Sequence, residues 1–113
     1  MQSDQIIEKI RNKLSESDPA KRTVMNIFQF HFTDSEGQLI KSVVFDFKEL
    51  NIYEGNCSEP DAEVTISDEN FFMVGSKQTT FDDLMVDNKV KVEGDKEAFN
   101  KMVDKMRLNS KTE

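Results

Sequence analysis

Apolar side chains at the start of the chain repeat with the period of an α-helix. They recur at intervals of three and four residues from Ile6 to Leu14, behind Ser3 and Asp4. Serine and aspartate both accept hydrogen bonds from the free N–H groups that open a helix. The spacing therefore predicts an amphipathic helix over residues 4–16.

The apolar period changes to two from residue 24 onward. Alternation of this kind places every second side chain on the same face of a strand. Two such strands, over residues 24–33 and 39–47, are separated by the turn-forming segment 34–37 and are predicted to form a hairpin. Their inward residues are expected to be Val24, Phe28, Phe30, Phe32, Leu39, Val43, Phe45 and Phe47.

Two shorter strands are predicted next. One lies around Leu50 to Tyr53, and the other is marked by the alternation of Ala62, Val64 and Ile66. The sheet up to this point is expected to be antiparallel, because successive short strands are most often joined as hairpins.

The pattern returns to helices after Ile66. The segment 67–70, Ser-Asp-Glu-Asn, is typical of a helix cap followed by an acidic first turn, and Gly75 is expected to close this short helix. Thr79 or Thr80 is predicted to cap a second short helix that begins near Phe81.

The last part of the chain predicts one more strand and one more helix. Residues 89–93 alternate valine with charged side chains, and Asp95 after Gly94 is a good cap for the final helix. The inner side of that helix is predicted to carry Ala98, Phe99, Met102, Val103 and Met106. The predicted order is helix, four strands, two short helices, strand, helix, which is an α+β protein with a single domain over residues 1–113.

Composition narrows the possible partners. The net charge is −7, from 22 acidic and 15 basic residues, so the chain has no basic footprint for nucleic acid. The start of the chain has neither a basic segment nor an apolar run of the kind found in secretory signals, and Cys57 is the single cysteine. A soluble, cytoplasmic protein is expected.

Residues with catalytic potential are few. His31 lies on the polar side of its strand without a serine or cysteine beside it in sequence, and Cys57 lies in a loop with acidic neighbours. Asp82 and Asp83 follow a helix cap, where they complement the helix dipole. The carboxylates lack the spacing of a metal loop and the glycines are isolated, so we expect no enzyme activity, no metal and no cofactor.

Several segments of the second half resemble one known family in the same order. Residues 62–71 resemble its strand leading into an Asp-Glu-x-Phe helix start, and residues 90–95 resemble its strand, Gly-Asp turn and last helix. Gly75 to Lys77 with Phe81 match the region between them, and Asp18 to Arg22 are similar to short, free-standing insect-type members. The chain therefore resembles the sterol carrier protein 2 domain.

The resemblance implies both a fold and a function. The family fold is a five-stranded, mostly antiparallel sheet covered by helices, which enclose an apolar tunnel. The tunnel implies a non-catalytic carrier of one long-chain fatty acid, acyl-CoA or sterol, with transient contact to membranes. Nine phenylalanines and six methionines suit an adaptable lining, but such residues equally form an ordinary packed core. The alternative is therefore a protein-interaction module with the same fold and a filled cavity.

Periodicity and the family resemblance together predict which residues form the binding site. The predicted cavity lining is Val24, Phe32, Phe45, Ile66, Phe71, Leu84, Phe99, Met102, Val103 and Met106. By resemblance to insect-type members, a lipid head group is expected to meet Arg22 and Lys13, with Thr23 as a supporting donor. The final residues 111–113, Lys-Thr-Glu, depart from the peroxisomal tripeptide that many family members carry, which favours the cytoplasm.

Overall fold

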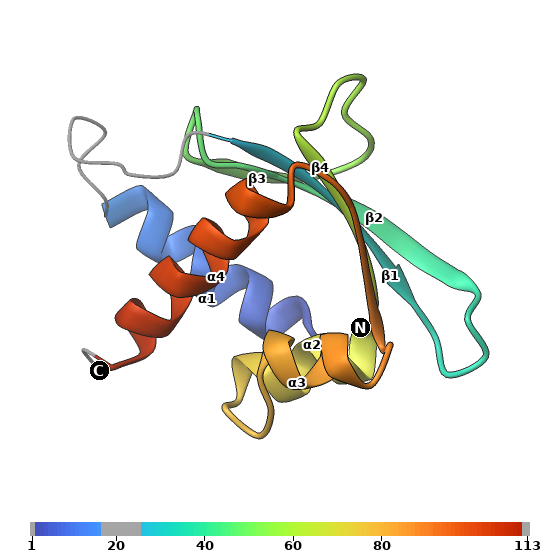
Figure 1. Ribbon diagram of the computed structural model, residues 1–113. Helices are drawn as coiled ribbons and strands as arrows, with labels where there is room; N and C mark the ends of the chain where they lie inside the picture. Colours follow the sequence, from blue (N-terminus) through green and yellow to red (C-terminus); the bar gives the residue numbers. More distant parts are fainter. Residues whose placement is uncertain (1, 17–25, 112–113) are drawn as a thin grey trace.

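A computed structural model describes the backbone of residues 2–16 and 26–111 and the side chains of residues 2–12 and 26–103. Four helices and five strands follow one another in the predicted order (Figure 1). They are α1 (Asp4–Glu16), β1 (Ile27–Thr33), β2 (Leu39–Asp46), β3 (Asn51–Glu54), β4 (Ala62–Ser67), α2 (Asp68–Gly75), α3 (Phe81–Val86), β5 (Val90–Gly94) and α4 (Lys96–Lys111).

The five strands form one mixed sheet in the order β3-β2-β1-β4-β5. Three of its pairings are antiparallel, but β4 lies parallel to β1, with Phe30 opposite Val64. The expectation that the sheet is antiparallel as far as Ile66 was therefore wrong. Alternation in the sequence determines which face of a strand is buried. The direction of β4 depends instead on the connection after β3, which crosses the sheet to place β4 on the other side of β1.

The helices cover one face of the sheet (Figure 1). Contacts place α1 on β3, α2 on β4, α3 on β5, and α4 on both β4 and β5. The face beneath them carries the alternating phenylalanines of β1, all fully buried. Burying a phenylalanine contributes about 1.5–3 kcal/mol, so this face fixes the register of the strand.

One residue of the predicted inner face is not buried. The side chain of Leu39 is 61% exposed, because it begins β2 at the end of the hairpin that projects past the helices (Figure 1). The register between β1 and β2 also shifts here, so that Leu39 lies opposite Thr33. In β2 the four residues from Val43 to Asp46 are all buried, whereas the first four are exposed or half-buried. Val24, which was expected on the same face, lies outside the described residues.

The predicted caps of α2, α3 and α4 are present. The Ser67 hydroxyl accepts a hydrogen bond from Asn70 N at 3.0 Å, and Thr80, rather than Thr79, accepts one from Asp83 N at 3.1 Å. Asp95 accepts one from the first turn of α4 in the same way. Each cap is worth about 0.5–2 kcal/mol relative to alanine.

Gly75 is the last residue of α2, as expected, and it has a second role that the sequence did not indicate. The next residue, Ser76, is the C-cap of α2, and its N–H donates to Phe72 O and Val74 O. A Cβ atom added to Gly75 would lie 2.4 Å from Cγ2 of Ile6 and 2.6 Å from its Cγ1 and Cδ1. Glycine at this position therefore allows α1 and α2 to approach each other closely.

The outer face of the sheet is partly covered by the loop after β3. Gln29 points to this face but is buried. Its Oε1 accepts from Cys57 N at 2.6 Å, and its Nε2 donates to Gly55 O at 2.9 Å. One glutamine side chain thus binds both ends of a three-residue segment of the loop. Within the part of the chain that the structure describes, no helix is long and apolar enough to cross a membrane.

Candidate functional site

The predicted cavity residues gather between the sheet and the helices. All those with described side chains are at most 5% exposed and belong to one apolar cluster: Phe32, Phe45, Ile66, Phe71, Leu84, Phe99, Met102 and Val103. Their burial agrees with the predicted inward orientation, while contact with a lipid stays a prediction. Val24 and the side chain of Met106 lie outside the described residues.

Aromatic rings connect the sheet to the last helix through this cluster. The centroids of Phe32 and Phe71 are 5.1 Å apart, those of Phe71 and Phe81 are 6.3 Å apart, and those of Phe81 and Phe99 are 5.4 Å apart. These separations are typical of favourable ring pairs. Phe81 was not among the predicted lining residues, although its place directly after the Thr80 cap indicates a side chain that turns inward.

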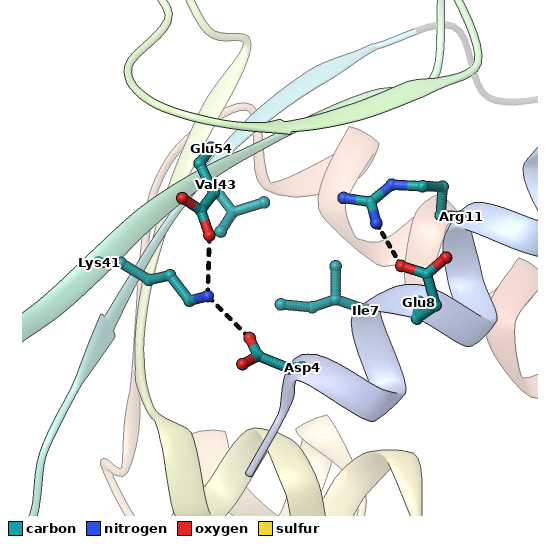
Figure 2. A pocket seen from close by; sticks show the side chains of 7 residues that line it. All are labelled: Asp4, Ile7, Glu8, Arg11, Lys41, Val43 and Glu54. Carbon is teal, nitrogen blue, oxygen red and sulfur yellow. Dashed lines mark hydrogen bonds and ion pairs between the residues drawn. The ribbon is translucent and has the colours of Figure 1, made fainter. Parts of the chain in front are cut away.

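A pocket of about 220 Å³ opens where α1 meets β2 and β3 (Figure 2). We call it the α1–sheet pocket. Its apolar wall consists of Ile7 and Val43, which are both members of the buried cluster. Its remaining lining is charged: Asp4, Glu8, Arg11, Lys41 and Glu54. The pocket is therefore a polar opening directly above the apolar interior.

Lys41 is the cation on the sheet side of the pocket. Its Nζ donates to Asp4 Oδ1 at 2.7 Å and to Glu54 Oε1 at 2.9 Å. The hydrogen bonds to Asp4 and Glu54 raise the pKa of Lys41. The hydrogen bond from Lys41 lowers the pKa of Asp4 in turn, so the pair stays charged throughout the neutral range.

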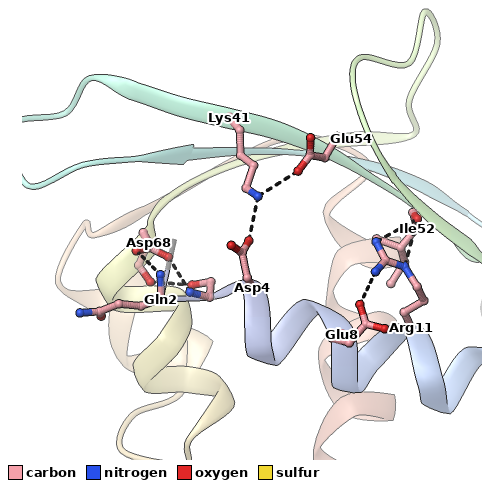
Figure 3. A network of polar contacts seen from close by, with 9 residues as sticks. Gln2, Asp4, Glu8, Arg11, Lys41, Ile52, Glu54 and Asp68 are labelled. Carbon is pink, nitrogen blue, oxygen red and sulfur yellow. Dashed lines mark hydrogen bonds and ion pairs between the residues drawn. The ribbon is translucent and has the colours of Figure 1, made fainter.

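Arg11 is the cation on the helix side. Its Nε and Nη2 donate to Ile52 O at 3.4 and 3.3 Å, and its Nη1 donates to Glu8 (Figure 3). The guanidinium therefore joins α1 to the edge strand β3. Figure 2 shows Arg11 and Lys41 on opposite sides of Ile7 and Val43.

The start of α1 is held in place by α2. The carboxylate of Asp68 accepts from Ser3 N at 2.7 Å and from Gln2 N at 2.9 Å, and the Ser3 hydroxyl donates to Asp68 O at 2.7 Å (Figure 3). Close contact between Ile6 and Gly75 adds an apolar attachment at the next turn. These contacts position the helix wall of the α1–sheet pocket.

Sequence reasoning missed this pocket, although two signals mark it. Residues 4, 7, 8 and 11 of α1 have the i, i+3, i+4, i+7 spacing that places side chains on one helix face. Lys41 has the same strand parity as Val43 and Phe45, so the alternation assigns a lysine to the helix-covered face. A cation at an inward position indicates a polar site.

The predicted head-group residues are not placed by the structure. Arg22 and Thr23 lie outside the described residues, and so does the side chain of Lys13. Their role stays a prediction.

Another polar group occupies the outer face of the sheet. His31 Nδ1 lies 2.9 Å from Ser42 Oγ, and its Nε2 lies 3.8 Å from Glu63 Oε2. Ser42 was not visible as a neighbour in the sequence because it comes from the antiparallel partner strand. These side chains point away from the apolar cluster, and such cross-strand pairs contribute roughly 0.2–1 kcal/mol to a sheet.

The described residues include no group of three or more histidine, cysteine, aspartate or glutamate side chains that could hold a metal ion. Cys57 is a free, half-buried thiol.

Comparison with known proteins gives one consistent family. The model of the SCP-2 sterol transfer family matches residues 4–106. Sterol carrier protein 2-like 3 from Aedes aegypti is 34% identical, with a TM-score of 0.82 over 93% of this chain and 96% of that chain. No protein among those with curated functions matches the sequence significantly.

Two similar structures contain palmitate. Sterol carrier protein 2 from Aedes aegypti in complex with palmitate is 27% identical, with a TM-score of 0.81 over 92% of this chain and 93% of that chain. Palmitated sterol carrier protein 2-like 2 from the same organism is also 27% identical, with a TM-score of 0.78 and the same coverage.

Proposed function

Since the chain belongs to the SCP-2 sterol transfer family, we propose that it is a non-catalytic carrier that holds one long-chain lipid between its sheet and its helices. The cargo is a fatty acid, an acyl-CoA or a sterol, which the carrier exchanges with membranes or enzymes. The observation that carries this proposal is the presence of palmitate in two relatives whose fold matches 92% of this chain.

The apolar cluster supplies a sufficient driving force. Burying about 14 methylenes at ~0.8 kcal/mol each contributes ~11 kcal/mol, and association costs at least ~4 kcal/mol. The difference corresponds to a roughly micromolar dissociation constant. Met102 on α4 supports entry of an acyl chain, because methionine adapts to irregular neighbours.

A protein-interaction module with a filled cavity is not favoured, because the palmitate-containing relatives use the same fold to bind a lipid. For a fatty acid, the proposed carboxylate anchor is Arg22 with Lys13 and Thr23. The proposed location is the cytoplasm, where an unpaired thiol such as Cys57 stays reduced. Co-localisation of the tagged protein with a peroxisomal marker would contradict that location.

Two measurements test the carrier. Organic extraction of the purified protein followed by mass spectrometry should yield acyl chains or sterols. Titration with a fluorescent fatty acid should then show that Phe99→Asp and Met102→Asp bind at least tenfold more weakly, since a buried carboxylate opposes an acyl chain.

Asn100→Asp is the matched control, because it adds the same charge to the exposed side of the same helix. Circular dichroism identifies the variants that keep the fold. If Phe99→Asp and Met102→Asp stay folded and bind like the unmodified protein, the lipid does not lie in this cluster.

A further inference from the structure

The charges of the α1–sheet pocket select for a particular kind of head group. Three carboxylates and two cations line it, so the lining carries a net charge of −1 in a chain whose net charge is −7. A purely anionic head group would add negative charge to an already negative site. Each cation also contacts a carboxylate already, as Lys41 does with Glu54 and Arg11 with Glu8.

These ion pairs can be exchanged at little cost. Side-chain exposure is 57% for Glu8 and 69% for Glu54, and exposed pairs of this kind contribute little to stability. A ligand anion can replace a carboxylate beside a cation, provided that the displaced carboxylate finds another partner. A ligand that also carries an ammonium group supplies that partner, so the exchange leaves no unpaired charge.

We propose that the α1–sheet pocket binds a zwitterionic head group of a single-chain lipid. The anion lies between Lys41 and Arg11, and the ammonium group faces Glu8 and Glu54. The inference rests on the proposed function, because the acyl chain then lies in the apolar cluster beneath Ile7 and Val43.

The depth of the charged groups fits this orientation. Lys41 is the least exposed charged side chain of the lining, at 26%, so the ligand anion lies deepest, next to the apolar interior. Among the described residues, Asp4 and Glu54 use two of the three N–H donors of Lys41. The third donor serves a ligand oxygen, and Arg11 reaches the same space from the opposite wall (Figure 2).

The size of the pocket fits a head group rather than a whole lipid. Its volume of about 220 Å³ falls below the ~300–1,000 Å³ of pockets that enclose a complete ligand. Ile7 and Val43 belong to the buried cluster, so the floor of the pocket borders the apolar interior in which the chain of the lipid is proposed to lie.

Two kinds of lipid share this chemistry. An acylcarnitine has a carboxylate and a quaternary ammonium group, and a lysophosphatidylcholine has a phosphate and the same ammonium group. Palmitate has no cation, and its predicted anchor is Arg22. Binding of palmitoylcarnitine, lysophosphatidylcholine, lysophosphatidic acid and palmitate is therefore measured by calorimetry below their critical micelle concentrations.

The variants separate the two head-group positions. Lys41→Met should weaken the binding of at least one of the two zwitterions about tenfold, which is the scale of one charge-assisted hydrogen bond. The same variant should change palmitate binding less than twofold. The zwitterion whose binding is weakened shows whether the pocket takes an acylcarnitine or a lysophosphatidylcholine. Lys91→Met is the matched control, since Lys91 is an exposed lysine of β5 that also pairs with a glutamate.

The acidic side is tested with Glu8→Gln combined with Glu54→Gln, two exposed substitutions that keep the size of each side chain. This double variant should bind the same zwitterion more weakly and lysophosphatidic acid more tightly. Unchanged binding of both zwitterions in the double variant overturns the inference, even if Lys41→Met fails to fold. Palmitate binding by the unmodified protein reports separately on the proposed carrier function, which fails if palmitate does not bind.

Discussion

Replacement of Gly75 by alanine tests how α1 is fixed against α2. The new Cβ would lie 2.4 to 2.6 Å from three side-chain atoms of Ile6, well inside van der Waals contact. Ile6 is buried and β-branched, so it has essentially one χ1 rotamer in a helix and cannot rotate away. The two helices must therefore separate, or Ile6 must adopt a strained conformation.

The magnitude follows from two opposing effects. Overpacking of this kind costs about 1–3 kcal/mol. Alanine is a better helix former than glycine by about 1 kcal/mol in a helix interior, and by less here, because Gly75 is the last residue of α2. The clash is the larger effect, so Gly75→Ala should lower the free energy of unfolding by about 1–2 kcal/mol.

A double-mutant cycle with Ile6→Ala isolates the contact. Ile6→Ala alone should cost about 2–5 kcal/mol, and it empties the space that the new methyl group needs. Adding Gly75→Ala to this variant should then be neutral or stabilising by up to about 1 kcal/mol. The effect of one substitution thus reverses its sign between the two backgrounds.

Urea unfolding followed by circular dichroism measures all four free energies. A coupling energy above about 0.5 kcal/mol marks residues in direct contact. If Gly75→Ala costs the same with Ile6 and with alanine at position 6, the close approach of α1 and α2 does not explain the glycine.

Further predictions concern polar contacts. Asp4→Asn should lower stability by no more than about 1 kcal/mol at neutral pH, because the pair with Lys41 is partly exposed. The pKa of Asp4 is lowered in the folded state, so this contribution is present above the ordinary aspartate pKa of about 3.9 and is lost as the pH falls through the folded value. If urea titrations show that Asp4→Asn lowers the free energy of unfolding equally at pH 7 and pH 2, the pair makes no ionic contribution. Gln29→Leu leaves Cys57 N and Gly55 O without their partner and should cost about 1–3 kcal/mol, with faster amide exchange at Cys57. Gln38→Leu on the exposed hairpin is its control, and unchanged exchange at Cys57 would show that Gln29 does not hold the loop.

Local signals in the sequence were enough for most of the fold. The period of two predicted the buried face of β1, and the caps at Ser67, Thr80 and Asp95 predicted where three helices begin. Each of these signals depends on residues a few positions apart. The parallel pairing of β1 with β4 depends on residues 34 positions apart, such as Phe28 and Ala62, and no local pattern encodes it.

The site was less accessible for the same reason. The members of the apolar cluster could be predicted because inward residues recur at regular spacing. The α1–sheet pocket depends on a contact between one helix face and two strands, and its charged residues look like ordinary surface positions one by one. Lys41 was the available clue, since it interrupts the apolar side of β2. Gly75 was correctly predicted to end α2, but its contact with Ile6 could not be predicted, because Ile6 belongs to a different helix.

The attachment of Ser3 to Asp68 has a consequence for synthesis on the ribosome. The helix α1 ends at Glu16, and its partner Asp68 follows 52 residues later. At about 5–20 residues per second, α1 waits roughly 3–10 s for its partner on α2. During that time Ile6 and Ile7 are available to chaperones or to other nascent chains. The first helix to be made thus gains its contact with α2 only after four of the five strands have been made, and substitutions at Asp68 should reduce the yield of folded protein in the cell more than its stability once folded.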